Sequence, residues 1–173
     1  MTKAELYQKA EYLRDSVFAA SDGIVTTFAI AAGSTGAHID NSVVLILGLA
    51  NLFADSFSMA SGNYLGIKSE MDYEVAEKLP EDKKRSPVTH SIYTFISFNL
   101  AGLFPLMPYL LGINNPFKIS IIIVVIELFL IGVMRSKMTK RSWIISGWEM
   151  LSVGGIAAGV AFFVGLLTDK YIT

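Results

Sequence analysis

The sequence predicts an all-α integral membrane protein whose single domain, residues 1–173, crosses the bilayer five times. Hydrophobic residues make up 53% of its 173 residues and charged residues only 17%, against about 25% in a typical soluble domain. Five apolar stretches approach the roughly 20 residues that a helix needs to span a bilayer. Basic residues are also distributed unevenly among the segments that join these stretches. The five expected spans cover residues 17–37, 43–65, 89–111, 117–135 and 145–167.

The segments around the first two spans predict helices that project beyond the membrane. Residues 4–16, AELYQKAEYLRDS, form an amphipathic pattern that enters the first span without a helix breaker. The stretch HIDNS separates the first two spans. Residues 66–79 continue the second span as a polar helix, which we expect to stop at Pro80. The joint at 66–88 is the longest in the chain and rich in charge.

Prolines and small residues characterise the later spans. We expect Pro105 and Pro108, in GLFPLMPYLLG, to bend or end the third span near the outer face. Pro116, in GINNPFK, is well placed to open the fourth span. The small residues of AIAAGSTGA in the first span and GGIAAG in the fifth allow helices to approach closely. Gly154 and Gly155 could serve a subunit contact or packing within one subunit.

The basic residues indicate how the spans are oriented. If the chain crosses five times, all but Lys118 and Lys170 of the 14 lysines and arginines lie on one side. The positive-inside rule places that side and the N-terminus in the cytoplasm, and the C-terminus outside. The N-terminal residues lack the apolar core of a cleavable signal peptide. Without a targeting segment, we expect a prokaryotic plasma membrane, with an organelle membrane as the alternative.

The composition also excludes several classes of site and partner. The chain has no cysteine, which excludes disulfides, thiolate metal ligands and a cysteine nucleophile. Its net charge of −1, without a basic stripe, gives no indication of a nucleic-acid partner. We find no internal repeat and no second domain.

Polar residues line one face of each of the first two spans. In the second span they are spaced by four and fall nearly in line on a helix: Asn51, Asp55, Met59 and Asn63. The first span and its extension hold a counterpart, clustered on one face at 100° per residue: Glu11, Asp15, Asp22 and Thr26. A carboxylate at mid-membrane costs about 2.5–3.5 kcal/mol. Because no Lys or Arg lies deep in any span, we expect Asp22 and Asp55 to bind a proton or a metal ion.

Met59 indicates which metal such a site would accept. Carboxylates and amides suit hard cations such as Mg²⁺ and Ca²⁺, whereas a thioether favours softer ions, including Fe²⁺ and its neighbours. The mixed set suits a transition metal that is bound weakly enough to be released. The alternative is that Met59 only packs against a neighbouring helix.

Four other titratable residues invite simpler interpretations. Glu127, in IIIVVIELFLIGV, is mid-span and is either a proton carrier or a neutral acid bonded to a neighbouring helix. Glu149 lies near a membrane edge, where its side chain can reach water. His38 and His90 lie at span ends, and we expect both to be solvated.

Several motifs resemble the vacuolar iron transporter family, from about Glu11 to Leu167. They are SDGIVTTFAIAAGSTGA, LANLFADSFSMASGNYLGIKSE, FPLMPYLL and RSWIISGWEMLSVGGIAAGVAFFVGLL. The resemblance implies a five-helix fold that forms a homodimer, with an ion path between the subunits lined by the first two helices. It also implies that Fe²⁺ leaves the cytosol in exchange for protons, and some members accept Mn²⁺.

The resemblance assigns roles to individual residues. Asp22 in SDG and Met59 in SMASGNY match the family's intramembrane metal ligands, and Glu11 matches an acidic residue at the cytosolic entrance. Asn51 stands where some members have a glutamate. Asp55 stands where the family often has a small residue, so we infer that the carboxylate has moved one turn along the same stripe.

The joint between the second and third spans departs from the family pattern. Many members carry a long glutamate-rich helical domain there, which collects metal. This chain has only IKSEMDYEVAEKLPEDKKRSPV. Its acidic residues either form a solvated face or retain a part of the collecting role: Glu70, Asp72, Glu74 and Glu77.

We therefore expect a homodimeric exporter of Fe²⁺, with Mn²⁺ as a second substrate, driven by proton influx, and not an enzyme. No permanently bound cofactor is expected beyond the transported metal and the coupled proton. The expected metal site comprises Asp22, Asp55, Met59, Asn51, Asn63, Glu11 and Asp15.

The main alternative is a membrane protein that binds or senses metal without moving it. An enzyme acting on lipid head groups is a weaker rival, because the buried acids have no basic neighbours to bind phosphate. A transporter of organic cations or of protons is a minor option, and few aromatic residues lie near the stripe to bind an organic cation.

Overall fold

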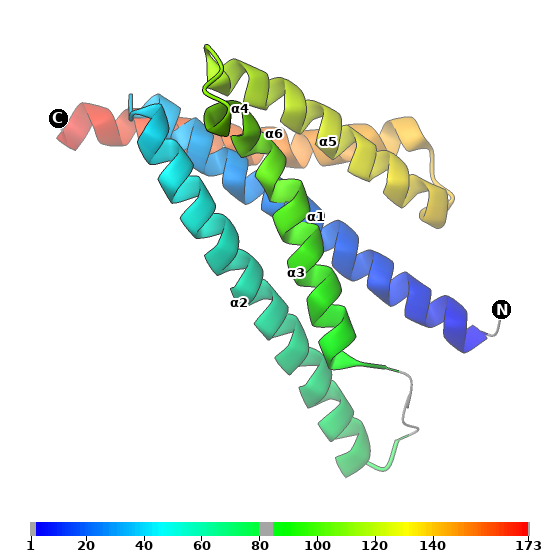
Figure 1. Cartoon of the computed structure of the whole chain (residues 1–173). Coiled ribbons are helices and arrows are strands. Elements are labelled where there is room, and N and C mark those ends of the chain that lie inside the picture. Colours follow the sequence, from blue (N-terminus) through cyan, green and yellow to red (C-terminus); the bar gives the residue numbers. More distant parts are fainter. Residues whose placement is uncertain (1–2, 80–84, 173) are drawn as a thin grey trace.

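The computed structural model describes residues 3–79 and 85–172, and every regular element among them is helical (Figure 1). In chain order these are α1 (Lys3–Gly36), α2 (Asn41–Ala76), α3 (Pro87–Leu103), the 3₁₀ helix η1 (Phe104–Leu106), α4 (Met107–Leu110), α5 (Pro116–Thr139) and α6 (Trp143–Ile172). Five segments are long and apolar enough to cross a membrane, with α3, η1 and α4 together forming the third. The five predicted spans are therefore confirmed as helices of membrane-spanning length.

The ends of these helices follow from local sequence. α1 continues from the amphipathic segment into the apolar span without a break, as expected. α2 ends at Ala76, and Lys78 then adopts a left-handed conformation with φ of 56°. Pro80, which we expected to stop this helix, lies outside the described residues. α5 begins at Pro116 as predicted, because proline at the first turn lacks only an N–H that would be unpaired there anyway.

Two prolines convert one turn of the third span into a 3₁₀ helix. Pro105 cannot donate to the carbonyl of Ala101, and the N–H of Phe104 bonds to that carbonyl instead. Pro108 likewise cannot donate to the carbonyl of Phe104, which accepts from the N–H of Met107. The hydroxyl of Ser120 on α5 donates to the carbonyl of Pro105 at 2.8 Å and so ties this turn to the next span. Of the two expectations, a bend or an end of the helix at these prolines, the structure shows that α3 ends at Leu103 and a 3₁₀ turn follows.

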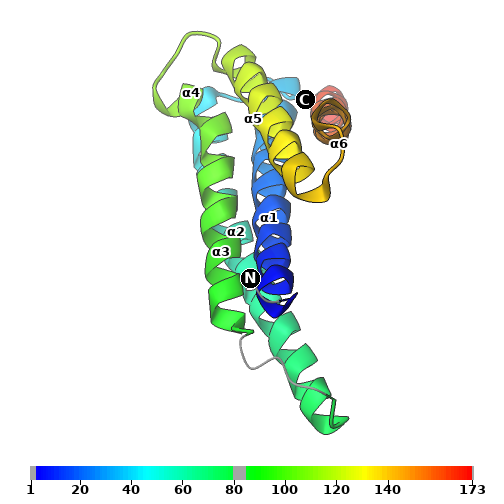
Figure 2. The same cartoon turned by 90° about the vertical axis from the view of Figure 1, so that its right-hand side faces the viewer.

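α1 is the central helix and contacts α2, α3, α5 and α6. In Figure 2 it runs between α3 on one side and α6 on the other. Its apolar face supplies Ile24, Phe28 and Ala31 to the core, where they pack with Val124 and Leu128 of α5. α1 therefore presents different faces to different neighbours, and these faces separate the two sites described below.

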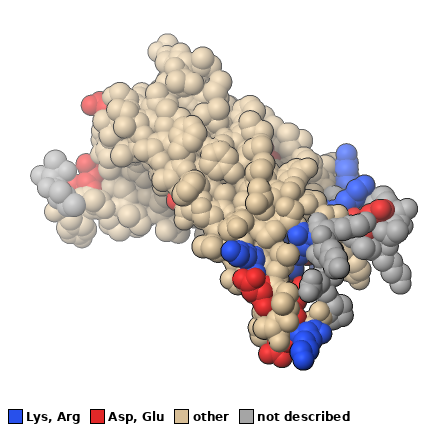
Figure 3. Space-filling view, turned by 60° about the horizontal axis from the view of Figure 1, so that its bottom comes forward, with Lys and Arg blue, Asp and Glu red and all other residues tan. Residues whose placement is uncertain are grey.

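Charged side chains are concentrated at one end of the molecule. In Figure 3 most of those on the visible face lie around the ends of the helices at the right-hand side, and the rest of that face is largely uncharged. The outer faces of α5 and α6 expose large apolar side chains such as Ile126, Leu130, Ile156 and Phe163. This distribution suits helices in contact with lipid.

Candidate metal site

The four residues of the α2 stripe share one half-buried face, as their spacing predicts. The stripe lies between a buried row, which includes Leu52 and Ser56, and an exposed row of small residues. Asn51 Nδ2 donates a hydrogen bond to Asp55 Oδ2 at 2.8 Å. The amide thus supports the carboxylate one turn away and helps to hold it on this face.

One level of polar groups forms where Asp22 of α1 meets Asp55 of α2. Both side chains are half-buried, and their carboxylates lie close enough to repel each other. Two neighbouring carboxylates within apolar helices are stabilised when a proton or a cation binds to them. Thr26, on the same face of α1, instead donates its hydroxyl to the carbonyl of Asp22 at 2.8 Å.

A second level forms toward the charged end of the same helices. Asp15 of α1, Met59 and Asn63 of α2 and Thr94 of α3 line a cavity of about 180 Å³. Asn63 Nδ2 donates to Thr94 Oγ1 at 2.8 Å, which orients the amide within the cavity. The cavity therefore combines carboxylate, thioether, amide and hydroxyl groups, a mixed donor set suited to a transition metal.

The structure thus divides the predicted site into two levels. Met59 lies with Asp15 and Asn63, whereas Asp22 and Asp55 lie near each other. Seven residues of helix separate Asp15 from Asp22, which corresponds to about 10 Å along the axis. Among the described residues, no group of three or more His, Asp or Glu side chains could hold a metal ion.

His90 is the main departure from the sequence interpretation, which placed it in water. Its side chain is fully buried, and its Nδ1 hydrogen-bonds to Asp15 Oδ2 at 2.5 Å. The ring of Tyr12 stacks on the imidazole with centroids 4.3 Å apart. The other oxygen of Asp15, Oδ1, accepts from the guanidinium of Arg14 at 3.0 and 3.1 Å. Asp15 is therefore held in place by two neighbours.

The burial of His90 follows from where α3 begins. Ser86 caps this helix by accepting from the N–H of Thr89, and Pro87 occupies its first turn. His90 then falls in line with Thr94 and Phe98, and all three are buried where α3 packs on its neighbours. This spacing of four is visible in the sequence. It places His90 on the same helix face as Thr94 and Phe98, so the burial of His90 could have been predicted from it.

The acidic residues near the charged end do not form one cluster. Arg85, whose side chain is only 11% exposed, places Nη2 2.7 Å from Glu70 Oε2 and 3.5 Å from Glu11 Oε1. It therefore joins α1 to α2 across the expected entrance. Asp72 and Glu77 are exposed, in agreement with a solvated face, and Glu74 is half-buried. The lysines at 83 and 84, which contributed to the orientation argument, lie outside the described residues.

The remaining titratable residues lie away from these two levels. Glu149 is exposed and pairs with Arg135 at 3.1 Å, as expected for a side chain at a membrane edge. His38 is exposed, as predicted, with its Nδ1 3.2 Å from Asp169 Oδ2. Glu127 faces a separate cavity.

The sequence is similar to a known protein family and to several of its members. The sequence profile of the VIT family matches residues 13–84 and 75–166. A vacuolar iron transporter of Toxoplasma gondii is 27% identical over 230 aligned residues, which cover 94% of this chain and 76% of the relative. Vacuolar iron transporter 1 of Arabidopsis thaliana is 28% identical over 90% of this chain and 86% of its own length. Vacuolar iron transporter homolog 4 of the same plant is 27% identical over 170 residues, covering 93% and 86% of the two chains.

The lengths of these alignments differ among the relatives, from 170 residues for homolog 4 to 230 for the Toxoplasma gondii protein. The alignment to the Toxoplasma gondii protein spans 230 residues, more than the 173 of this chain. That relative therefore carries segments that this chain lacks. The two matches to the family profile overlap at 75–84, within the joint between α2 and α3, where the resemblance implies a longer domain in many members.

Proposed function

The chain belongs to the VIT family, and we propose that it moves Fe²⁺ out of the cytosol, with Mn²⁺ as a second substrate. The observation that carries the proposal is the cavity that Asp15 of α1 shares with Met59 and Asn63 of α2, and Asp22 lies near Asp55 on the same two helices. A cation passing between the helices would meet a mixed thioether and oxygen site and then a pair of carboxylates. The named relatives are transporters, which supports transport ahead of enzymatic chemistry.

The working unit in this proposal is a homodimer with the metal path between the subunits. One protomer presents an incomplete ligand shell, and a second copy would double every ligand on the α1 and α2 faces. Beside the stripe, α2 exposes the small residues Ala54, Ser58 and Gly62 at a spacing of four. Small residues in this pattern allow two membrane helices to approach closely.

Proton exchange would drive the metal through the same path. A proton competes with a metal ion for carboxylate oxygens, so proton binding at Asp22 or Asp55 would help to expel the metal. Following the basic residues, the N-terminus lies in the cytoplasm and the C-terminus on the opposite side. The relatives are named vacuolar proteins. Their names do not support the expected prokaryotic plasma membrane, which stays a prediction.

The test is metal flux into sealed proteoliposomes, with Fe²⁺ and Mn²⁺ supplied in parallel and a pH dye on each side. We expect metal uptake matched by opposite proton movement in the wild type. Asp22→Asn should abolish uptake while the protein still inserts, because it removes one of the neighbouring carboxylates. The matched control is Asp40→Asn, at an exposed helix cap whose side chain makes no capping hydrogen bond.

The outcomes separate transport from binding. Full uptake by Asp22→Asn would contradict the proposed path. Metal binding without flux, from wild-type protein that is dimeric and inserted, would favour the metal-binding or sensing alternative.

A further inference from the structure

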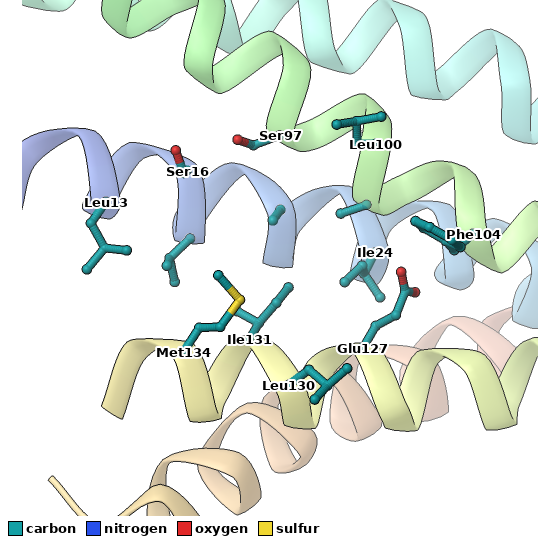
Figure 4. Close-up of a pocket in the computed structure, with 13 residues that line it drawn as sticks. Leu13, Ser16, Ile24, Ser97, Leu100, Phe104, Glu127, Leu130, Ile131 and Met134 are labelled. Atoms are coloured by element: carbon teal, nitrogen blue, oxygen red, sulfur yellow. The ribbon is translucent and has the colours of Figure 1, made fainter. Parts of the chain in front are cut away.

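A second cavity lies between α1, α3 and α5, away from the metal path (Figure 4). Its volume is about 350 Å³, and its walls are almost entirely apolar. α1 contributes Ile24, α3 contributes Leu100 and Phe104, and α5 contributes Ile131. Among the described residues that line it, Glu127 alone can ionise.

Among the residues that the structure describes, Glu127 has no partner that would explain a carboxyl group at this position. Its Oε2 is fully buried and makes no hydrogen bond within the described part of the chain. Figure 4 shows the side chain extending from α5 toward Ile24 and Phe104. A bond from this oxygen to a neighbouring helix, one of the two interpretations of the sequence, is therefore not formed.

The two sites occupy opposite faces of α1. Leu13, Val17 and Ile24 line the Glu127 cavity, whereas Asp15 lines the metal cavity and Asp22 lies near Asp55. At 100° per residue, the first group clusters about half a turn away from the second. The full width of a helix, about 10 Å with its side chains, thus separates Glu127 from the candidate metal ligands.

The surroundings of Glu127 favour reversible protonation. No charged or titratable side chain of α1, α3 or α6 lines this cavity among the described residues. The ion pair of Arg135 with Glu149 lies two turns farther along α5. A carboxylate is disfavoured in an apolar cavity without water and is favoured once water enters. The ionisation state of Glu127 therefore depends on whether the cavity is dry or hydrated.

We propose that Glu127 binds and releases the exchanged proton at a site separate from the metal, so that proton and metal use opposite faces of α1. The inference rests on the proposed function, which supplies metal transport coupled to protons. The carboxylate takes a proton while the cavity is hydrated from the side of higher proton concentration. The neutral acid persists while the cavity is dry, and the proton is released when water enters from the cytosol. Movement of α1, which borders both sites, couples the two events.

Proteoliposomes carrying Glu127→Gln test this inference, because glutamine keeps the volume and imitates the neutral acid. We expect exchange of labelled for unlabelled metal at equal pH to persist. Uptake driven by a pH gradient should be lost. The matched control is Glu149→Gln, which makes the same chemical change at the exposed ion pair and should retain both activities.

Two results would overturn the inference. Uptake driven by a pH gradient at the wild-type rate in Glu127→Gln would show that this residue carries no coupled proton. Loss of metal-for-metal exchange in the same variant would show that Glu127 is not separate from the metal path. Absence of metal flux in the wild type would contradict the proposed function itself.

Infrared difference spectra after a pH jump provide a readout that does not require transport. In vesicles without metal, a protonated carboxyl band should change in the wild type and in Glu149→Gln, and this change should be missing from Glu127→Gln. An identical band change in Glu127→Gln would overturn the assignment even if the transport results agreed with it.

Discussion

At the scale of single residues, Met59 has the clearest chemical role to test. Its thioether shares a cavity with the carboxylate of Asp15 and the amide of Asn63, the surroundings that distinguish a soft ligand from a packing residue. A thioether favours Fe²⁺ more than Mn²⁺, which prefers oxygen ligands. Met59 should therefore influence which metal passes and not only how fast.

We predict that Met59→Leu lowers Fe²⁺ uptake more than Mn²⁺ uptake, because leucine keeps the volume and removes the sulfur. The measurement is competition between the two metals in proteoliposomes. Met134→Leu, on the face of α5 that lines the Glu127 cavity, is the control. If the ratio of Fe²⁺ uptake to Mn²⁺ uptake is unchanged, Met59 contributes only to packing.

The two histidines form a natural comparison, because one is buried and the other exposed. His90→Leu leaves the buried Asp15 carboxylate with one hydrogen-bonding neighbour fewer. We predict a loss of about 1–3 kcal/mol in the free energy of unfolding, the usual cost of an unsatisfied buried group. His38→Leu, at the exposed pair with Asp169, should change it by less than about 0.5 kcal/mol. Denaturant titration in detergent measures both, and equal losses would refute the structural role of His90.

At the scale of helices, the contact between α1 and α6 depends on glycine. A Cβ added at Gly165 would collide with the backbone of Gly33, and one added at Gly36 would collide with the carbonyl of Phe162. The small residues predicted to permit close helix approach therefore do so in the first span. In the fifth, Gly154 packs against Leu128, whereas Gly155 and Gly159 have open space within the described chain.

Alanine substitutions at two glycines of α6 should therefore differ in their effect on the free energy of unfolding. We predict that Gly165→Ala destabilises the protein by about 1–3 kcal/mol, because the backbones of α1 and α6 must separate. Gly159→Ala should be neutral or stabilising by up to about 1 kcal/mol, because alanine favours helix and meets nothing there. Unfolding midpoints in detergent compare the two variants. A destabilising Gly159→Ala would indicate a contact of α6 beyond this subunit.

At the scale of the whole molecule, the proposed homodimer accounts for the half-buried stripe. The chain has no native cysteine, so a single introduced cysteine reports its own contacts. Ser58 lies on the exposed small face of α2, beside the stripe. Disulfide formation requires Cα atoms within about 7 Å.

We predict that Ser58→Cys forms a disulfide-linked dimer in membranes treated with a mild oxidant, as seen on a non-reducing gel. Ser152→Cys, on the exposed side of α6, should remain monomeric. Cross-linking of Ser152→Cys alone would show that the subunits meet at α6 and that the α2 stripe faces lipid.

Several features of this protein were determined by the sequence alone. The five spans, the interruption of the third span at Pro105 and Pro108 and the start of α5 at Pro116 all depend on hydropathy or on missing N–H groups. The α2 stripe depends on the repeat of the helix, and Asn51 and Asp55 meet because they are one turn apart. These features are local, so neighbouring residues in the chain suffice to predict them.

The tertiary structure decided which polar residues share a site. Asp15, rather than Asp22, lies with Met59, because the axial offset between α1 and α2 sets which side chains meet. His90 is buried because its helix packs on its neighbours at that turn, although its place near a span end suggested water. Within the described part of the chain Glu127 Oε2 lacks a partner, because apolar side chains of three helices line its cavity. Such contacts join residues far apart in the sequence, and they depend on how helices pack, which hydropathy and periodicity do not specify.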